Sequence, residues 1–203
     1  MLQRRDSVNS TFRLVTRFNV MTWRKWYALV FGLMLVLSVS GFSQASREEA
    51  LAKVYPGAAI RPERLFLTNE QIAAARALAG TDVETALVAR YLAVADGKAV
   101  GRAYIDTHVV RTKRESLLIC LDEKGAVKRI EVTAFLEPPE YEPPPAWYAQ
   151  FAGKPLNDAL NIDRAIRPIA GATLTGAATT RAVRRILAID RVVTGVTTGE
   201  RRP

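Results

Sequence analysis

Two turn signals, each lying between two apolar segments, most constrain the fold of this chain. Asp96-Gly97 is the dipeptide type most strongly associated with a two-residue hairpin, because both positions tolerate a positive φ. Asp122-Glu123-Lys124-Gly125 gives a second, longer turn. The segments that flank these turns, and that are expected to be strands, are residues 85–95, 98–106, 115–121 and 126–135. The two hairpins predict an antiparallel sheet of about four strands.

Helix signals lie on both sides of these hairpins. Thr68-Asn69-Glu70-Gln71 is a capping box, in which the Thr and Gln side chains satisfy backbone N–H groups at a helix start. Gly80 is typical of a helix end, so a helix is predicted over residues 69–79. A second helix is predicted through Val183 and Leu187. The whole pattern predicts an α+β fold, an antiparallel sheet with helices packed on it.

Four segments are predicted along the chain. Residues 1–45 are expected to be a signal peptide or an N-terminal membrane anchor helix, and residues 46–80 a helical arm. Residues 81–192 form the main domain, and residues 193–203 a flexible tail. No internal repeat is visible in the sequence.

The leader has the pattern of an export signal. Arg24-Lys25 precede the uncharged, mostly apolar residues 26–39, and Ser43-Gln44-Ala45 offers small residues at the two positions that a signal peptidase reads. Cleavage after Ala45 is predicted, and the alternative is an uncleaved anchor that keeps the N-terminus in contact with the membrane. Either way, we expect the domain in the periplasm or on the extracytoplasmic face of the inner membrane.

Composition and charge exclude several classes of site. The chain has one cysteine, Cys120, and one histidine, His108, so a disulfide framework, a Cys/His zinc site and an iron–sulfur cluster are excluded and no metal site is expected. The leader carries +5 of the net charge of +9, and the remaining arginines are spread out without interleaved aromatics. We therefore expect no nucleic-acid partner.

Small residues and hydroxyls stand at the start of the long C-terminal helix, as Ala170-Gly171-Ala172-Thr173-Leu174-Thr175-Gly176. The first N–H groups of a helix have no intrahelical partner and lie at the positive end of its dipole. Gly and Ala leave room for a ligand to approach the backbone. This helix start is therefore predicted to bind a phosphate group.

A proline-rich loop, residues 137–145, precedes that helix start. Its prolines exclude a central strand and a helix interior, because proline lacks the N–H that both ladders need. We expect a stiff surface loop or the wall of a site.

These residues resemble the FMN-binding domain family, which includes flavin subunits of the sodium-pumping quinone reductase and of the Rnf complex, and related exported electron-transfer proteins. The family has Ser/Thr-Gly-Ala-Thr before a hydroxyl-rich helix start, which here is Ala170 to Thr175. It also has a Glu-Thr-Pro-Gly-Leu loop, then a Trp and a Gln-Phe-x-Gly-Lys stretch. The corresponding residues here are Glu137 to Tyr141, Trp147 and Gln150 to Lys154.

The resemblance implies a cofactor and a set of binding residues. In the family, a dedicated flavin transferase uses FAD to esterify the threonine of the motif to the phosphate of FMN, which makes Thr173 the attachment residue here. The residues that the resemblance assigns to the FMN site are Gly171, Ala172, Thr173, Leu174, Thr175, Glu137, Pro139 and Tyr141. Pro139, Tyr141 and Trp147 are candidate walls for the flavin ring, and Glu137 or Thr175 a candidate polar contact.

Two positions depart from the family pattern. Ala170 stands where the family usually has Ser or Thr, and Arg167 stands where it has Asp. Non-covalent FMN is therefore kept as an alternative to the phosphoester at Thr173.

The expected function is that of an exported electron-transfer flavoprotein. Its FMN passes electrons between a membrane-bound donor and an extracytoplasmic acceptor, so its partners are membrane-associated electron-transfer proteins and, for maturation, a flavin transferase. No nucleophile–base pair or pair of carboxylates stands out in the sequence, so no catalytic residue is assigned. The alternative is a flavin-free periplasmic binding or assembly module.

Two further groups of polar residues have a structural interpretation. Arg181, Arg184 and Arg185 are expected on the solvated face of the C-terminal helix, with contact to the FMN phosphate or to an acidic partner as the alternative. His108 is interpreted as a polar residue at a hairpin end, with proton donation as the alternative.

Overall fold

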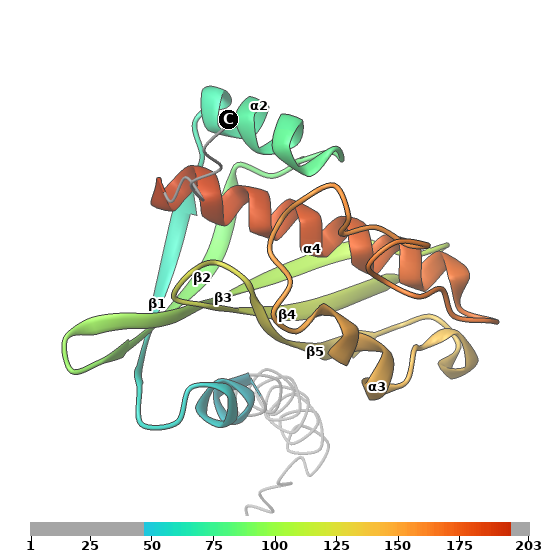
Figure 1. Ribbon diagram of the computed structural model, residues 1–203, viewed down its shortest axis with the longest axis horizontal. Helices are drawn as coiled ribbons and strands as arrows, with labels where there is room; N and C mark the ends of the chain where they lie inside the picture. The colour runs from blue at the N-terminus through green and yellow to red at the C-terminus, as the bar shows by residue number, and fades with distance from the viewer. Residues whose placement is uncertain (1–46, 196–203) are drawn as a thin grey trace, which may run out of the picture. The chain divides into compact units, whose positions relative to one another are not determined.

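The computed structural model describes residues 47–195, and the predicted leader lies outside these residues. Their fold is α+β and is built on one antiparallel sheet of five strands in sequential order (Figure 1). The strands are β1 (Ala59–Phe66), β2 (Leu87–Ala95), β3 (Lys98–Val109), β4 (Arg114–Asp122) and β5 (Val127–Phe135). The prediction of about four strands missed β1.

Strand β1 lies within residues 46–80, the expected helical arm, and pairs with β2 along its whole length. Pro62 stands in its middle, and a proline within an apolar run argues against a central strand. The structure accommodates it because β1 is an edge strand, with a neighbour on one side only.

Both predicted hairpins are present. Asp96 and Gly97 have φ of 50° and 74°, the two positive values that a tight turn between β2 and β3 requires. The second turn connects β4 to β5, where the Asp122 carboxylate accepts hydrogen bonds from the N–H groups of Lys124 and Ala126, both at 2.9 Å. Each turn sets the register within its own hairpin, β2 with β3 and β4 with β5.

Helices cover both faces of the sheet. The predicted capping box is confirmed for α2 (Asn69–Ala79), since Thr68 and Gln71 exchange side-chain-to-backbone hydrogen bonds of 3.2 and 2.9 Å. The long helix α4 (Thr173–Thr194) crosses one face, with α2 beside it, and helix 47–54 lies on the other face (Figure 1).

Apolar side chains on both faces explain this arrangement. Along β4, Leu117, Ile119 and Leu121 join the core beneath α4, while Leu118 and Cys120 join a smaller core against helix 47–54. Burying both faces of the same strand needs a helix on each side. Helix α4 therefore has a fixed position above β3 and β4.

The proline-rich loop makes short helical turns before α4 begins. They are η1 (Pro139–Tyr141), α3 (Pro145–Tyr148) and η2 (Ala149–Phe151). At the other end, α4 continues to Thr194, so the first two residues of the predicted tail are helical. Among residues 47–195, no helix combines the length and the apolar character that a membrane span requires.

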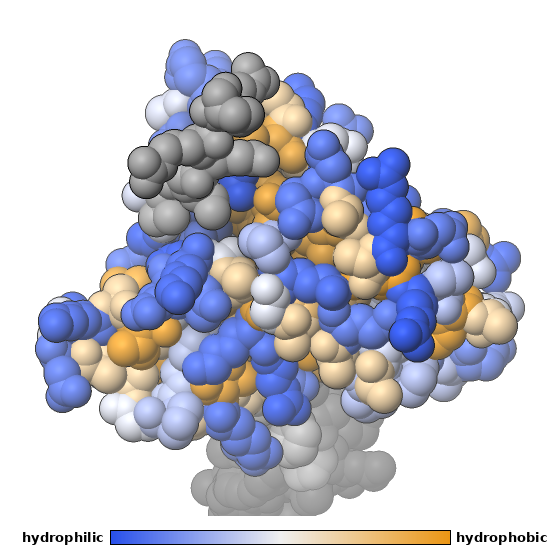
Figure 2. All heavy atoms as spheres, in the orientation of Figure 1, coloured by the Kyte–Doolittle hydropathy of each residue, from blue (hydrophilic) through white to orange (hydrophobic). Residues whose placement is uncertain are grey.

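The face of the molecule drawn in Figure 2 is mixed in character. Hydrophilic side chains alternate with small apolar areas on it (Figure 2). Six large apolar side chains of the described residues are clearly exposed; they are Phe66, Leu78, Leu87, Val109, Leu136 and Leu174.

Candidate functional site

The start of α4 leaves its first N–H groups open. Ala172 occupies the N-cap position and has no side chain that can accept from the first turn, and no other described side chain caps this end. Gly171 has φ +82° and open space beside it, so a bulky residue would be strained here. The Thr173 side chain is exposed, and its hydroxyl makes only a long, 3.4 Å hydrogen bond to the Ile169 carbonyl.

A hollow of about 150 Å³ lies against this helix start. It is lined by Arg111, Tyr141, Gly171, Ala172, Thr173, Leu174 and Thr175. The structure thus brings Tyr141 of the proline-rich loop together with five residues of the predicted helix start. Combined with the open N–H groups, the hollow offers donors and a cation to an anionic group.

The size of this hollow bears on its fit to FMN. Pockets that enclose a whole small-molecule ligand are typically about 300–1,000 Å³, so this hollow has room for a phosphate group and not for a three-ring flavin as well. Apolar surface for a ring exists beside it, because Leu174 is 54% exposed at the hollow's edge. The residues present fit the phosphate end of FMN, and a flavin ring would have to lie outside the hollow.

Arg111 is the lining residue that the sequence reasoning missed. Its guanidinium carbon lies 5.0 Å from the centre of the Tyr141 ring, a distance at which a cation is attracted to an aromatic face. Arg111 lies in the turn between β3 and β4, 62 positions before Thr173, the first residue of α4. No local sequence signal distinguishes it from the other arginines.

Glu137 stabilises that turn through hydrogen bonds to its backbone. Its Oε1 accepts hydrogen bonds from the N–H groups of Arg111, Thr112 and Lys113 at 3.0, 2.7 and 2.7 Å. The amides of Thr112 and Lys113 hold the pKa of the Glu137 carboxyl below its usual value. Glu137 does not line the hollow; it holds the backbone from which Arg111 projects, and its proposed contact with flavin stays a prediction.

The remaining predicted residues have distinct positions. Thr175 is buried, and its hydroxyl donates to the Tyr141 carbonyl at 2.8 Å, which ties the proline-rich loop to α4. Pro139 is exposed at the start of η1 and does not line the hollow. Trp147 is buried among core residues and donates from Nε1 to the Arg167 carbonyl at 2.8 Å.

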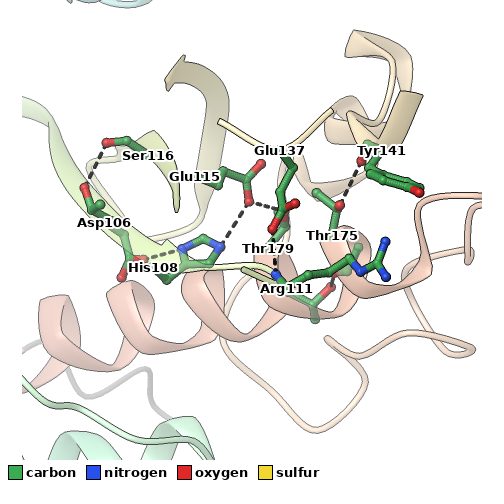
Figure 3. A network of polar contacts seen from close by, with 12 residues as sticks. Asp106, His108, Arg111, Glu115, Ser116, Glu137, Tyr141, Thr175 and Thr179 are labelled. Atoms are coloured by element: carbon green, nitrogen blue, oxygen red, sulfur yellow. Dashed lines mark hydrogen bonds and ion pairs between the residues drawn. The ribbon is translucent and has the colours of Figure 1, made fainter. Parts of the chain in front are cut away.

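A buried acid–base chain runs beneath α4 beside this site (Figure 3). His108 lies between two carboxylates, with Nδ1 2.9 Å from Asp106 Oδ1 and Nε2 3.0 Å from Glu115 Oε2. Glu115 is fully buried and also accepts from the hydroxyls of Tyr148 and Thr179, each at 3.1 Å. His108 thus lies near the end of the β3–β4 hairpin, as interpreted from the sequence, and its side chain is largely buried between these two carboxylates.

The pKa of His108 follows from these neighbours. Burial lowers the pKa of an imidazole, but the hydrogen bonds to Asp106 and Glu115 outweigh burial and raise the pKa above its ordinary value. The pKa of Asp106 is lowered, because hydrogen bonds from His108 and Arg185 outweigh the effect of burial. The imidazolium form, with N–H groups donating to both carboxylates, is the one these contacts favour.

The three arginines that were expected on one solvated face of α4 do not share that face. Arg181 is exposed as expected, but Arg184 and Arg185 are half-buried. Arg184 donates to the carbonyls of Ala79 and Asn157, both at 2.7 Å, and Arg185 forms a two-pronged contact with the Asp106 carboxylate at 2.7 and 2.8 Å. Their long side chains reach neighbouring elements, which a helical pattern alone does not reveal.

Comparison with known proteins adds no relative. No protein-family model matches the chain, and no curated protein sequence matches it.

Proposed function

We propose that this protein is an exported electron-transfer protein that carries FMN through a phosphoester to Thr173. One observation carries the proposal: an exposed hydroxyl lies on the uncapped first turn of a 22-residue helix, next to Arg111 and Tyr141. The resemblance of residues 137–154 and 170–175 to the FMN-binding domain family supplies the identity of the ligand.

The described contacts support attachment at Thr173 rather than at Thr175. The Thr175 hydroxyl is 1% exposed and already donates to the Tyr141 carbonyl, so it is not accessible to a transferase. Thr173 is accessible and has only a weak internal partner. In the proposed reaction, the transferase joins Thr173 Oγ1 to the FMN phosphorus of FAD. The pyrophosphate bond between the FMN and AMP halves breaks, AMP leaves, and the threonine hydroxyl proton is released.

The open N–H groups of α4 and the Arg111 guanidinium would hold the phosphate that results. Both supply positive charge at the same point, and a phosphate at a helix start gains from each. Arg111 keeps its place because Glu137 holds the turn that carries it.

The small hollow supports electron transfer rather than substrate turnover. When bound, FMN supplies one-electron and two-electron redox chemistry. A ring that lies over Leu174 and Tyr141, outside any enclosed cavity, stays accessible to protein partners. We propose a membrane-bound donor and an extracytoplasmic acceptor as these partners.

The test is retention of flavin after denaturation. The protein is purified from a host that expresses a flavin transferase, denatured, and examined for flavin absorbance and in-gel fluorescence. We expect wild type and Thr175→Val to retain flavin, and Thr173→Ala to lose it, with native circular dichroism in each case.

Two other outcomes would overturn the proposal in different ways. Flavin that leaves wild type on denaturation indicates non-covalent FMN, the alternative that Ala170 and Arg167 leave open. Absence of flavin from the native protein favours a flavin-free periplasmic binding or assembly module instead.

A further inference from the structure

Strands β2 and β3 separate at one end of the sheet, and a groove of about 640 Å³ opens between them and α4. The β2–β3 ladder ends at Arg90 and Tyr104. Residues 87–89 therefore pair only with β1, and residues 105–109 pair only with β4. The two strands diverge from their shared hairpin (Figure 1).

The groove follows the free edge of β3. Its lining includes all of residues 105–109, and consecutive residues of a strand point to opposite faces of the sheet. Val88, which also lines the groove, packs in the core beneath α4, whereas Ile105 packs against the smaller core on the other face. A ligand in this groove therefore lies beside the strand edge, in the plane of the sheet.

Backbone groups of β3 are directed into this groove. Val109 pairs with Arg114, whose C=O accepts from the Leu136 N–H at 3.0 Å, on the side of β5. Opposite residues of an antiparallel pair either exchange both hydrogen bonds or direct these groups away from each other, so the N–H and C=O of Val109 face away from β4. The β3–β4 register has no shift, so Thr107 has the same orientation. No residue in the range 47–195 pairs with Thr107 or Val109 from that side.

The start of β2, across the groove, has a local partner instead. The Thr85 hydroxyl accepts from the Leu87 N–H at 3.1 Å and donates to the Leu87 C=O at 2.9 Å. The Leu87 backbone is thus already engaged, and the edge that stays free is that of β3.

The charges that line the groove cancel. Arg185 binds the Asp106 carboxylate, and His108 is balanced by Glu115, 3.0 Å from its Nε2. Three acidic side chains and three arginines line the groove; they are Asp82, Glu84, Asp106, Arg114, Arg181 and Arg185. A ligand without net charge matches this balance.

Apolar side chains lie on both sides of the free edge. Ile186 and Ile189 of α4 line the groove, and so do Leu87 and Val109, which are 49% and 55% exposed. The side chains of an extended chain alternate in direction, so one set would contact α4 and the other set Leu87 and Val109.

From these observations we propose that the groove binds an extended, uncharged segment of a partner protein, which adds to β3 as a further strand. The backbone of the segment pairs with Thr107 and Val109, and its alternate side chains contact Ile186 and Leu87. Flavin takes no part in this binding, so the inference goes beyond the proposed electron-transfer function.

The experiment titrates ¹⁵N-labelled full-length protein, made without a flavin transferase, with the acetylated and amidated peptide Thr-Val-Thr-Val-Thr. Valine and threonine favour an extended backbone, and the peptide carries no charge. We expect saturable binding with a dissociation constant on the order of 1 mM. Because no flavin is present, failure of the FMN proposal does not affect the result.

Hydrogen exchange of single amides reports the mode of binding. With peptide at about ten times its dissociation constant, the amides of Thr107 and Val109 should exchange about tenfold more slowly, because the bound state protects them. The amide of His108 faces β4 and should not change.

A modified peptide tests the backbone contribution. N-methylation of its three central residues removes N–H groups and keeps every side chain. The methylated peptide should bind about fivefold more weakly, because it cannot complete the hydrogen bonds to the strand edge.

Paired variants test the apolar contribution. Leu87→Ser with Val109→Ser should weaken peptide binding about fivefold. Phe66→Ser with Leu136→Ser removes two exposed apolar side chains that do not line the groove, and should leave binding unchanged.

Four results would overturn the proposal: no binding of the peptide, equal binding of the two peptides, equal affinity of the two double variants, or slow exchange of Thr107 and Val109 without peptide. The last result would place a second copy or another segment of this chain on the edge.

Discussion

At the scale of single residues, Glu137 supports the candidate site without lining it. One carboxylate oxygen accepts three consecutive N–H groups, and these fix the turn between β3 and β4. Hydrogen bonds to an ionised acceptor are about twice as strong as neutral ones. The turn therefore holds the backbone of Arg111, whose guanidinium lies over the Tyr141 ring. Glu137 contacts Arg111 through the backbone N–H.

Replacing Glu137 by Gln removes the charge but keeps the shape of the side chain. We expect the N–H groups of residues 111–113 to exchange with solvent about tenfold faster or more, because their acceptor is neutral. Native-state hydrogen exchange measures this directly. Glu140→Gln, an exposed glutamate of η1, is the matched control and should leave these amides unchanged. Equal exchange in both variants would argue against the role of Glu137.

The sequence predicts the local part of the site and misses the part that comes from elsewhere in the chain. Gly171 to Thr175 form a continuous helix start, so their grouping follows from helix chemistry alone. Arg111 enters the hollow through the β3–β4 turn, a contact between distant segments with no motif of its own. The same reason explains why the burial of His108 between Asp106 and Glu115 could not be predicted.

At the scale of elements, two ion pairs connect α4 to β3, one with its arginine on the strand and the other with its arginine on the helix. Arg102 of β3 binds the Asp190 carboxylate of α4 at 2.6 and 3.0 Å, and Asp106 of β3 binds Arg185 of α4. Tyr104 adds a hydroxyl 2.7 Å from Asp190. Residues 102 and 106 lie on the same face of β3, so the pairs fix both the position and the direction of the helix.

Asp190→Ala should be one of the most destabilising changes at this contact. It leaves the buried Arg102 guanidinium without its carboxylate, and loss of one partner of a buried pair costs about 3–5 kcal/mol. Urea unfolding measures the loss. The exposed Asp158 gives the control, since Asp158→Ala should change stability little. If the two alanine variants are equally stable, the ion pair does not hold α4.

The sequence predicts those elements whose ends carry a local turn or capping signal. Asp96-Gly97, Gly125 and the capping box at Thr68 define both hairpins and α2, since each is a local signal with a defined geometry. Strand β1 has no such signal. It contains Pro62 and depends on pairing with β2, which lies beyond α2 in the sequence. Pairing with β2 therefore makes this segment a strand, although its local sequence does not favour one.

At the scale of the whole molecule, the buried chain of Asp106, His108 and Glu115 couples folding to pH. The groups that face the imidazole are these two carboxylates, with Arg185 on Asp106 and the hydroxyls of Tyr148 and Thr179 on Glu115. Because the folded protein raises the pKa of His108, protonation stabilises the fold. The contribution is fully present below the unfolded pKa of about 6.5 and is lost as pH rises through the higher, folded pKa.

Stability should therefore decline as pH rises above about 6.5 in wild type. His108→Gln, which cannot gain a proton, should be less stable and should lack this decline. Urea unfolding at several pH values gives both curves, and NMR titration of the single histidine gives the folded pKa. A His108 pKa below about 6.5, or parallel curves for the two proteins, would contradict the inferred coupling.

The same architecture places an open helix end and its exposed threonine at one end of the sheet, where a phosphate-linked cofactor would be held without burial. The most direct test of this central claim is the mass of the tryptic peptide 165–181 from protein matured with a flavin transferase. Cleavage after Arg164 and Arg181 gives this peptide, because Pro168 protects the bond after Arg167. The account predicts the added mass of one FMN phosphoester, located at Thr173 by fragmentation. An unmodified peptide, or FMN located at Thr175, Thr179 or Thr180, would contradict it.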